Sequence, residues 1–476
     1  MVFTTSVFIF GFFPLCFLLY FVLYALERKS QIIRNAKLKY WTLLLFSLIY
    51  YSFFKISNIF LILSIIGITY LSGILIVKNN NRKVKKAIVA VDVVLNVGAL
   101  AFLKYFSPIY DWISPNSSLN IIAPLGISFI VFSSISYVVD VYRDNNCCGN
   151  FLESALYIVF FPKVVSGPIV LWKDFQPQLQ SITPSVNLTI KGINRLAVGF
   201  AKKLIISDTI GLFVSEGIGN ISIGIDSYSA WICMFLYFLQ IYTDFSSYSD
   251  ISIGISNIFG FSVKENFDFP YTATSITDFW RRWHISLGTW FKEYIYKPLG
   301  GSRQSWIRTI INISIIFIIT GVWHGCGVLY ILWGVLHGIC RIFEFIVGKT
   351  KVYLKTPRFI KWLFTTAIVM FGWLAFMLPN FADFKTFIGY MFGTIVVANP
   401  VLKFLYFSNI KLITAVVLAL LGTYLFRCKP IRSLSNMADN NIILFLLKEI
   451  IVLALFVMSI IFMVNSNYSP FIYFQY

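Results

Sequence analysis

Two short motifs in the C-terminal half of the chain place histidines among apolar residues. Gly321–Gly325 reads GVWHG and contains His324, and Trp333–Gly338 reads WGVLHG and contains His337. They hold two of the three histidines in the 476-residue chain. An ionisable side chain in an apolar membrane segment costs free energy, which favours a functional role. Imidazole titrates near neutral pH, so each of these histidines can serve as a general base.

The third histidine, His284, lies in a segment with helical periodicity. Ser275 predicts an N-cap, Asp278 an acidic first turn, and Asp278 with Arg282 an ion pair across one turn. One face carries Phe279, Trp283, Leu287, Trp290 and Tyr294, and the others carry Arg281, Arg282, Lys292 and Glu293. This composition predicts one amphipathic helix in the membrane interface. The alternative for the arginines is an anchor without chemistry, and for each histidine a core residue that bonds a neighbouring helix.

Two polar interruptions within apolar stretches are further candidates for a site. Phe161–Pro168 contains two prolines, a lysine and a glycine, and Gln240–Asp250 is rich in hydroxyl groups. Irregular or polar backbone at membrane depth is tolerated where it is buried in protein or lines a cavity. Both segments are therefore interpreted as walls of a water-accessible cavity, with a packing role as the alternative.

The elements that position these residues are expected to be membrane-spanning helices. Hydrophobic residues make up 58% of the chain and charged residues 12%, about half the charged share of soluble domains. Six apolar runs approach or exceed the ~20 residues that cross a bilayer, and six are shorter or more polar. The longer runs are Val7–Leu26, Ile56–Val77, Ala87–Phe106, Ile121–Val139, Trp362–Leu378 and Ile442–Val464; the others are Tyr40–Phe54, Ala155–Trp172, Tyr228–Thr243, Ile310–Val322, Val328–Val347 and Ile410–Phe426. The sequence predicts an all-α polytopic membrane protein with about ten to twelve spans, forming a single domain over residues 1–476.

The charge distribution predicts the topology. Basic residues cluster in Arg28–Lys39, Lys78–Lys86 and Arg427–Arg432, whereas Ser107–Asn120 contains no lysine or arginine. The positive-inside rule places the basic loops in the cytoplasm and both termini outside. Topology therefore accounts for most of the net charge of +19, attraction to anionic lipid for the rest, and nucleic-acid binding is not expected.

The cysteines suggest neither a metal site nor a disulfide framework. All seven are scattered, and adjacent Cys147 and Cys148 do not have the spacing of zinc ligands. Cys326, two residues after His324, is an alternative nucleophile, although a small cysteine more often only packs. A Gly-x-Ser-x-Gly elbow is absent from the sequence. Activation of a hydroxyl group would then need another base, such as histidine.

An ordered set of motifs resembles the membrane-bound O-acyltransferase family along nearly the whole chain. In sequence order the motifs are Pro124–Phe129, Phe161-Pro162 with Gly167-Pro168, Tyr242–Ser246, Asp278–His284 and Trp323–Gly325. The opening Met1–Thr4 and the ending Pro470–Tyr476 resemble the alginate- and peptidoglycan-acetylating branch of that family. Each motif alone is unspecific, whereas the ordered set is specific.

The resemblance implies a many-helix fold around a catalytic funnel or tunnel. It implies that His324 is the catalytic residue, that His284 takes the second polar position of the family, and that His337 is a further catalytic candidate. Candidates for substrate binding are the residues around them in the matching motifs: Trp323, Gly325, Asp244, Tyr242, Arg281, Arg282, Trp283 and Asp278.

The resemblance also implies a substrate and a location. We expect an enzyme of the bacterial inner membrane that moves an acyl group, most simply acetyl from acetyl-CoA, toward hydroxyls of an envelope polysaccharide. The acceptor would be reached directly or through an exported acyltransferase partner, with membrane lipids as surroundings and no bound cofactor. The alternatives are D-alanyl transfer to teichoic acid from a carrier protein and a non-catalytic transporter of a lipid-linked sugar.

Overall fold

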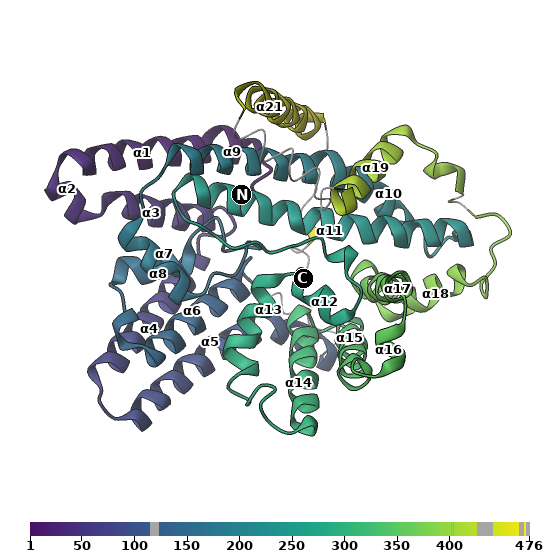
Figure 1. Ribbon diagram of the computed structural model, residues 1–476, viewed down its shortest axis with the longest axis horizontal. Helices are drawn as coiled ribbons and strands as arrows, with labels where there is room; N and C mark the ends of the chain where they lie inside the picture. The colour runs from purple at the N-terminus through teal and green to yellow at the C-terminus, as the bar shows by residue number, and fades with distance from the viewer. Residues whose placement is uncertain (115–122, 401, 403, 426–440, 466–470, 473–476) are drawn as a thin grey trace. The chain divides into compact units, whose positions relative to one another are not determined.

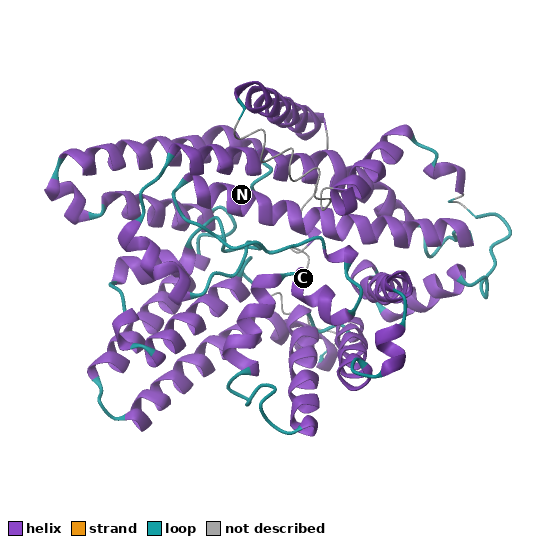
Figure 2. Ribbon diagram, in the orientation of Figure 1, coloured by secondary structure: helices purple, strands orange, loops and turns teal. Residues whose placement is uncertain are grey.

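The computed structural model describes residues 1–114, 123–400, 402, 404–425, 441–465 and 471–472. These residues form helices and connecting loops without named strands, apart from one isolated bridge between Ile225 and Leu402 (Figure 2). The predicted all-α class is thereby confirmed. The basic loop Arg427–Arg432, part of Ser107–Asn120 and most of Pro470–Tyr476 lie outside the described residues.

Within the described ranges, seven helices are long and apolar enough to cross a membrane. They are Phe8–Lys29, Asn58–Lys78, Arg82–Ile113, Trp306–His324, Val328–Val347, Arg358–Met377 and Ile442–Asn465. A shorter apolar helix covers Ile410–Tyr424. The chain is therefore a multi-pass membrane protein, as predicted, with fewer long spans among the described residues than the ten to twelve expected.

Four expected spans take a different form. Tyr40–Phe54 forms a 15-residue helix, and Ile121–Val139 forms a helix that starts only after Gly126. Gly126 has a φ of 76°, and an added Cβ would lie within contact distance of the Val164 carbonyl, so glycine is required there. The Ala155–Trp172 run is helical only up to Val159. Tyr228–Thr243 is part of a 32-residue helix that continues through the polar segment.

The chain divides into two compact units, and the division falls inside α9 and α11. Unit 1 comprises Met1–Leu196 and Ser249–Lys264, and unit 2 comprises Ala197–Tyr248 and Glu265–Tyr476. Figure 1 labels the helices that begin in unit 1, except η1 and η2. They are η1 (Phe8–Phe12), α1 (Phe13–Lys29), α2 (Gln31–Ala36), α3 (Leu38–Ser52), α4 (Asn58–Lys78), α5 (Arg82–Ile113), α6 (Ile127–Arg143), η2 (Asn145–Cys147), α7 (Phe151–Val159), α8 (Trp172–Ser181) and α9 (Val186–Ala201).

The proline-containing interruption Phe161–Pro168 is buried inside unit 1. The Phe161 N–H donates to Ser47 Oγ at 3.1 Å, and Lys163 Nζ donates to Ser133 Oγ at 2.8 Å and lies 4.0 Å from the Tyr157 ring centroid. Burial holds the pKa of Lys163 well below its usual range. Of the two environments that tolerate such a break, burial in protein describes this segment.

Unit 2 contains the remaining helices and all three histidines. The helices are η3 (Lys202–Ser207), α10 (Asp208–Gly219), α11 (Ser227–Ile258, which ends in unit 1), η4 (Pro270–Thr272), α12 (Ile276–Arg282), α13 (Ile285–Phe291), η5 (Lys292–Tyr296), α14 (Trp306–His324), α15 (Val328–Val347), α16 (Lys351–Lys355), α17 (Arg358–Met377), α18 (Phe381–Met391), η6 (Phe404–Phe407), α19 (Ile410–Tyr424) and α21 (Ile442–Asn465).

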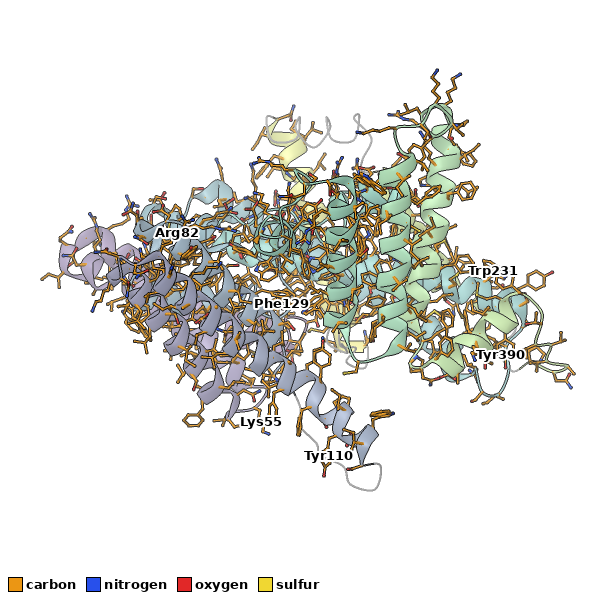
Figure 3. All side chains as sticks on the ribbon, turned by 90° about the horizontal axis from the view of Figure 1, so that it is seen from below. Lys55, Arg82, Tyr110, Phe129, Trp231 and Tyr390 are labelled. Atoms are coloured by element: carbon orange, nitrogen blue, oxygen red, sulfur yellow. The ribbon has the colours of Figure 1, made fainter. Side chains whose placement is uncertain are left out.

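Helices α14 and α15 form a tight hairpin in unit 2, and α17 packs against α15 (Figure 1). The hairpin is close because glycines face each other: a Cβ added to Gly321 would lie 3.5 Å from the Cα of Gly334. Small residues at such contacts let helix backbones approach in membranes. Elsewhere in the unit, Trp231 Nε1 donates to the Met391 carbonyl at 2.8 Å and Tyr390 Oη to the Ile221 carbonyl at 2.9 Å (both side chains labelled in Figure 3).

Candidate active site

His324 is the last residue of α14 and is enclosed by aromatic rings. Its side chain is buried. The ring centroid lies 4.6 Å from that of Trp323, 5.1 Å from Trp333 and 4.8 Å from Phe376, the last two edge-on. The helix ends because Gly325 adopts an extended conformation. A Cβ at Gly325 would lie 2.7 Å from the Tyr330 ring, so the glycine that follows the histidine allows the turn to close.

His337 lies one helix further along the hairpin and is fully enclosed. Its ring is 5.3 Å from Trp280, 5.1 Å from Trp333 and 6.5 Å from Phe317. Both ring nitrogens are buried, and neither has a hydrogen-bond partner among the described residues. A Cβ added to Gly372 of α17 would lie 2.9 Å from its Nε2. His337 therefore fits against α17 only because residue 372 has no side chain.

Tryptophans connect the histidine motifs within unit 2. Trp333 contacts both His324 and His337, each at a centroid distance of 5.1 Å. Trp373 of α17 stacks near Trp333 at 6.2 Å and contacts Trp283 at 4.8 Å. The structure thus brings together the Trp323–Gly325, Trp333–Gly338 and Asp278–His284 motifs, which the sequence analysis identified separately.

The prediction of one continuous amphipathic helix through His284 is wrong. Helix α12 ends at Arg282, Trp283 is extended, and α13 begins at Ile285. His284 itself has φ 46° and ψ 52°, a left-handed conformation that is unfavourable for a residue with a Cβ. Such strained residues persist when surrounding structure fixes them, and they cluster at functional sites. Phe279, Trp283, Leu287 and Trp290 are nevertheless all buried, as their spacing predicted.

Asn266 holds His284 in this conformation. The Asn266 carbonyl accepts from the Ile285 N–H at 2.9 Å, and its Oδ1 accepts from the Ser286 N–H at 3.1 Å and Ser286 Oγ at 2.8 Å. His284 Nδ1 lies 3.2 Å from the same Oδ1. Because that oxygen accepts from a backbone N–H, it cannot be the amide nitrogen, so Nδ1 is the donor and Nε2 carries the lone pair. Burial lowers the pKa of His284 to about 3, which keeps the ring neutral.

The charged candidates of α12 pair with one another. Ser275 caps the helix by accepting from the Asp278 N–H at 2.9 Å, which confirms the predicted N-cap. Arg282 Nε donates to Asp278 at 2.9 Å, as predicted, and its Nη1 to Asp268 at 3.1 Å. Arg281 is exposed. A substrate role for Asp278 or Arg282 would compete with these ion pairs, whereas Arg281 lies at the surface.

Asp244 and Tyr242 of α11 occupy two different environments. Tyr242 packs against Tyr271 at 5.2 Å and Trp283 at 6.2 Å. Asp244 is buried, and its Oδ1 accepts from Lys203 Nζ at 2.8 Å. Its Oδ2 accepts from the Ile472 N–H at 2.8 Å. Burial alone would lower the pKa of Lys203, but the carboxylates of Asp244 and Asp208 outweigh it and raise that pKa. Asp244 of α11 therefore binds both Lys203 of η3 and the backbone of Ile472.

A cavity of about 720 Å³ lies in unit 2 beside these groups. Its lining mixes apolar side chains with Asp208, Tyr237, Gln240 and Asn409. Phe376 lines this cavity and also contacts His324 edge-on, so one side chain touches both the candidate base and the open space. Among the described residues, no group of three or more His, Cys, Asp or Glu side chains could hold a metal ion.

Sequence reasoning missed three residues that position the site. Asn266 fixes His284, Gly372 makes room for His337, and Glu344 of α15 caps α12 by accepting from the Ile276 and Thr277 N–H groups and from Thr277 Oγ1. Asn266 belongs to no motif, and Glu344 and Gly372 lie inside apolar spans. The one signal available in the sequence was Glu344, a single carboxylate within the apolar span Val328–Val347, which indicates a polar role for that residue.

Fold and site together define a class: an all-α, multi-pass membrane protein with a buried histidine at a glycine-flanked helix end. The model of the membrane-bound O-acyltransferase family matches residues 40–382. The chain belongs to that family and is an O-acyltransferase, which confirms the resemblance seen in the motifs.

Three relatives match this chain over different shares of its length. The chain is 32% identical to a probable alginate O-acetylase AlgI of Pseudomonas putida over 100% of both chains. It is 31% identical to a peptidoglycan O-acetyltransferase of Helicobacter pylori, covering 80% of this chain and 77% of that one. A teichoic acid D-alanyltransferase of Bacillus subtilis is 30% identical over 53% of this chain and 66% of its own.

Proposed function

We propose that this enzyme transfers an acetyl group from a cytoplasmic thioester, acetyl-CoA, to hydroxyl groups of a cell-envelope polysaccharide. We further propose that it resides in the bacterial inner membrane, surrounded by lipid, and reaches the polysaccharide directly or through an exported acyltransferase. The similarity to the probable alginate O-acetylase of P. putida and the peptidoglycan O-acetyltransferase of H. pylori supports the acetyl group and the polysaccharide class.

The observation that carries the proposal is the position of His324. It ends a membrane-spanning helix at a glycine-flanked turn, and its ring contacts Phe376, which also lines a cavity large enough for a substrate. His337, by contrast, is enclosed by rings and by Gly372. We therefore assign the base to His324 and keep His337 and His284 as contributors to the same site.

The chemistry assigned to His324 is general-base catalysis. The imidazole removes the proton of the acceptor hydroxyl as the hydroxyl oxygen attacks the thioester carbonyl carbon. The new C–O bond forms, the C–S bond breaks, and the proton passes from the imidazolium to the departing thiolate. The surrounding aromatic rings exclude water, which protects the thioester from hydrolysis.

The test compares His324→Ala with wild type in acetyl transfer from radiolabelled acetyl-CoA. Loss of a general base should lower the rate by at least roughly 10²-fold, while insertion and amount in the membrane stay unchanged. His337→Ala should reduce transfer as well. Folded His324→Ala protein with near wild-type transfer would show that His324 is not the base.

D-alanyl transfer is the second candidate, because a teichoic acid D-alanyltransferase is similar over half the chain. The two donors separate the candidates: purified enzyme should consume acetyl-CoA and leave a D-alanyl carrier protein intact. Membership of an O-acyltransferase family removes the non-catalytic transporter from consideration.

A further inference from the structure

We propose that unit 1 contains a binding site for a phosphate-bearing ligand at the start of α5. A cavity of about 650 Å³ is lined there by Arg82 and Lys85 of α5 and by Tyr142 and Arg143 at the end of α6. Asp144 and Asn145, which follow α6, complete this wall. Arg82 is labelled in Figure 3.

The cavity carries a positive charge. It has three cationic side chains and one carboxylate. Arg143 Nη1 lies 3.9 Å from Asp140 Oδ1, an ion pair that offsets part of its charge, and the Asp144 carboxylate is already hydrogen-bonded. Asp144 Oδ1 accepts from the Asn146 N–H at 3.0 Å, and Cys147 Sγ donates to its Oδ2 at 3.5 Å. Lys85 Nζ donates to Asn145 Oδ1 at 3.1 Å, which links the two walls. An anion in this space would meet more cationic than anionic groups.

The donor set suits a phosphate group. Guanidinium groups bind phosphate oxygens through paired hydrogen bonds, and an ammonium adds a compact charge. The N-terminus of the 32-residue helix α5 lies at Arg82, where the helix dipole favours an anion. The cavity of about 650 Å³ leaves room beside a phosphate group for an organic part of the ligand, and Tyr142 lines that space.

Membrane topology alone does not explain this arrangement. The positive-inside rule accounts for lysines and arginines anywhere in the loop, including the exposed Lys83 and Lys86, which do not line the cavity. It does not account for Arg143 of α6 meeting Arg82 and Lys85 around one space. The rule does place the cavity on the cytoplasmic side, where two sources of phosphate esters occur: coenzyme A and anionic phospholipid headgroups.

The experiment compares two double variants of the full-length protein that remove the same charge. Arg82→Gln/Arg143→Gln alters the cavity, and Lys83→Gln/Lys86→Gln is the control outside it. Binding of coenzyme A is measured by calorimetry in a neutral detergent, with inorganic phosphate as competitor. Phosphatidylglycerol binding is measured as thermal stabilisation in vesicles, against phosphatidylcholine.

We expect wild type and control to bind at least one of these ligands and the cavity variant to bind it at least about tenfold more weakly, as for lost charge-assisted hydrogen bonds. Coenzyme A binding alone would identify the donor as the source, and phosphatidylglycerol binding alone the lipid. Absence of both from wild type, or equal weakening in both variants, would overturn the proposal. Coenzyme A as one of the two sources rests on the proposed function, but binding is compared between the two variants without acyl transfer, so failure of this site and failure of that function give different results.

Discussion

Gly372 offers a sharp test of the packing around His337. In Gly372→Ala the added methyl would lie 2.9 Å from His337 Nε2 and 3.4 Å from Trp333 Cδ1. Carbon contacts are optimal at about 3.5–4.0 Å, so the imidazole must retreat by roughly half an ångström or more. His337 is fully buried, with aromatic rings on its other sides. There is little space for that movement.

Two opposing terms decide the size of the effect. Overpacking a filled core costs about 1–3 kcal/mol, whereas replacing glycine by alanine inside a helix gains about 1 kcal/mol. Gly422→Ala in α19 separates these terms, because nothing lies within 4 Å of its added Cβ. It should show the helix gain alone. Gly372→Ala should therefore be less stable than Gly422→Ala by about 1–3 kcal/mol.

The assay is thermal unfolding of both purified variants in detergent, together with acyl transfer. We expect a lower unfolding temperature and reduced transfer for Gly372→Ala only. The double variant Gly372→Ala/His337→Ala removes the clashing ring and should be more stable than the sum of the two single changes predicts. Equal stability and activity of Gly372→Ala and Gly422→Ala would refute the packing argument.

Three further predictions concern the neighbouring α12 region. Trp283→Asp should lower the protein level in the membrane, because it buries a carboxylate without a partner. Arg282→Ala loses two partly exposed ion pairs and should leave the protein level nearly unchanged. Equal levels of the two variants on immunoblots would contradict this prediction. Glu344→Gln removes the charged cap of α12 and should destabilise the protein by about 1 kcal/mol, detectable as a lower unfolding temperature than for Glu216→Gln, an exposed control. The pKa of His284 is about 3 in the folded protein and about 6.5 in the unfolded chain. Between these pH values the unfolded chain binds more protons, so the stability of the folded protein falls as the pH drops below about 6.5. His284→Asn, which tolerates the left-handed backbone, should therefore lose less stability than wild type between about pH 7 and about pH 5.

The sequence predicted the helical class and the site motifs because both depend on local composition. Apolar runs such as Val328–Val347 coincide with the observed helix, since length and hydropathy suffice to form a span. Histidine is rare in such runs, so His324 and His337 were visible at once. Their shared contact with Trp333 was not predicted, because it depends on how α14 and α15 pack against each other.

The break at His284 could not be predicted from its own segment. Phe279, Trp283 and Leu287 repeat at helical spacing on both sides of it, and all are buried. The periodicity therefore predicted correctly which side chains are buried, but wrongly that they belong to one continuous helix. The cause lies elsewhere in the chain. Asn266 accepts hydrogen bonds from residues 285 and 286, and these bonds replace those of a continuous helix.

Glycines in the α14–α15 hairpin determine where the imidazole rings of His324 and His337 lie. Gly321 precedes His324 by three residues, and Gly334 precedes His337 by the same interval, so each glycine is one helical turn from its histidine. The two glycines face each other across the hairpin, and a Cβ on Gly334 would lie 2.5 Å from the Phe317 carbonyl oxygen. That neighbour is backbone and cannot rotate away, so any side chain at the contact must push α14 from α15. Because Trp333 contacts both imidazoles, such a displacement would change the surroundings of His324 and His337 together. The hairpin therefore positions the candidate base through close contact between the backbones of α14 and α15.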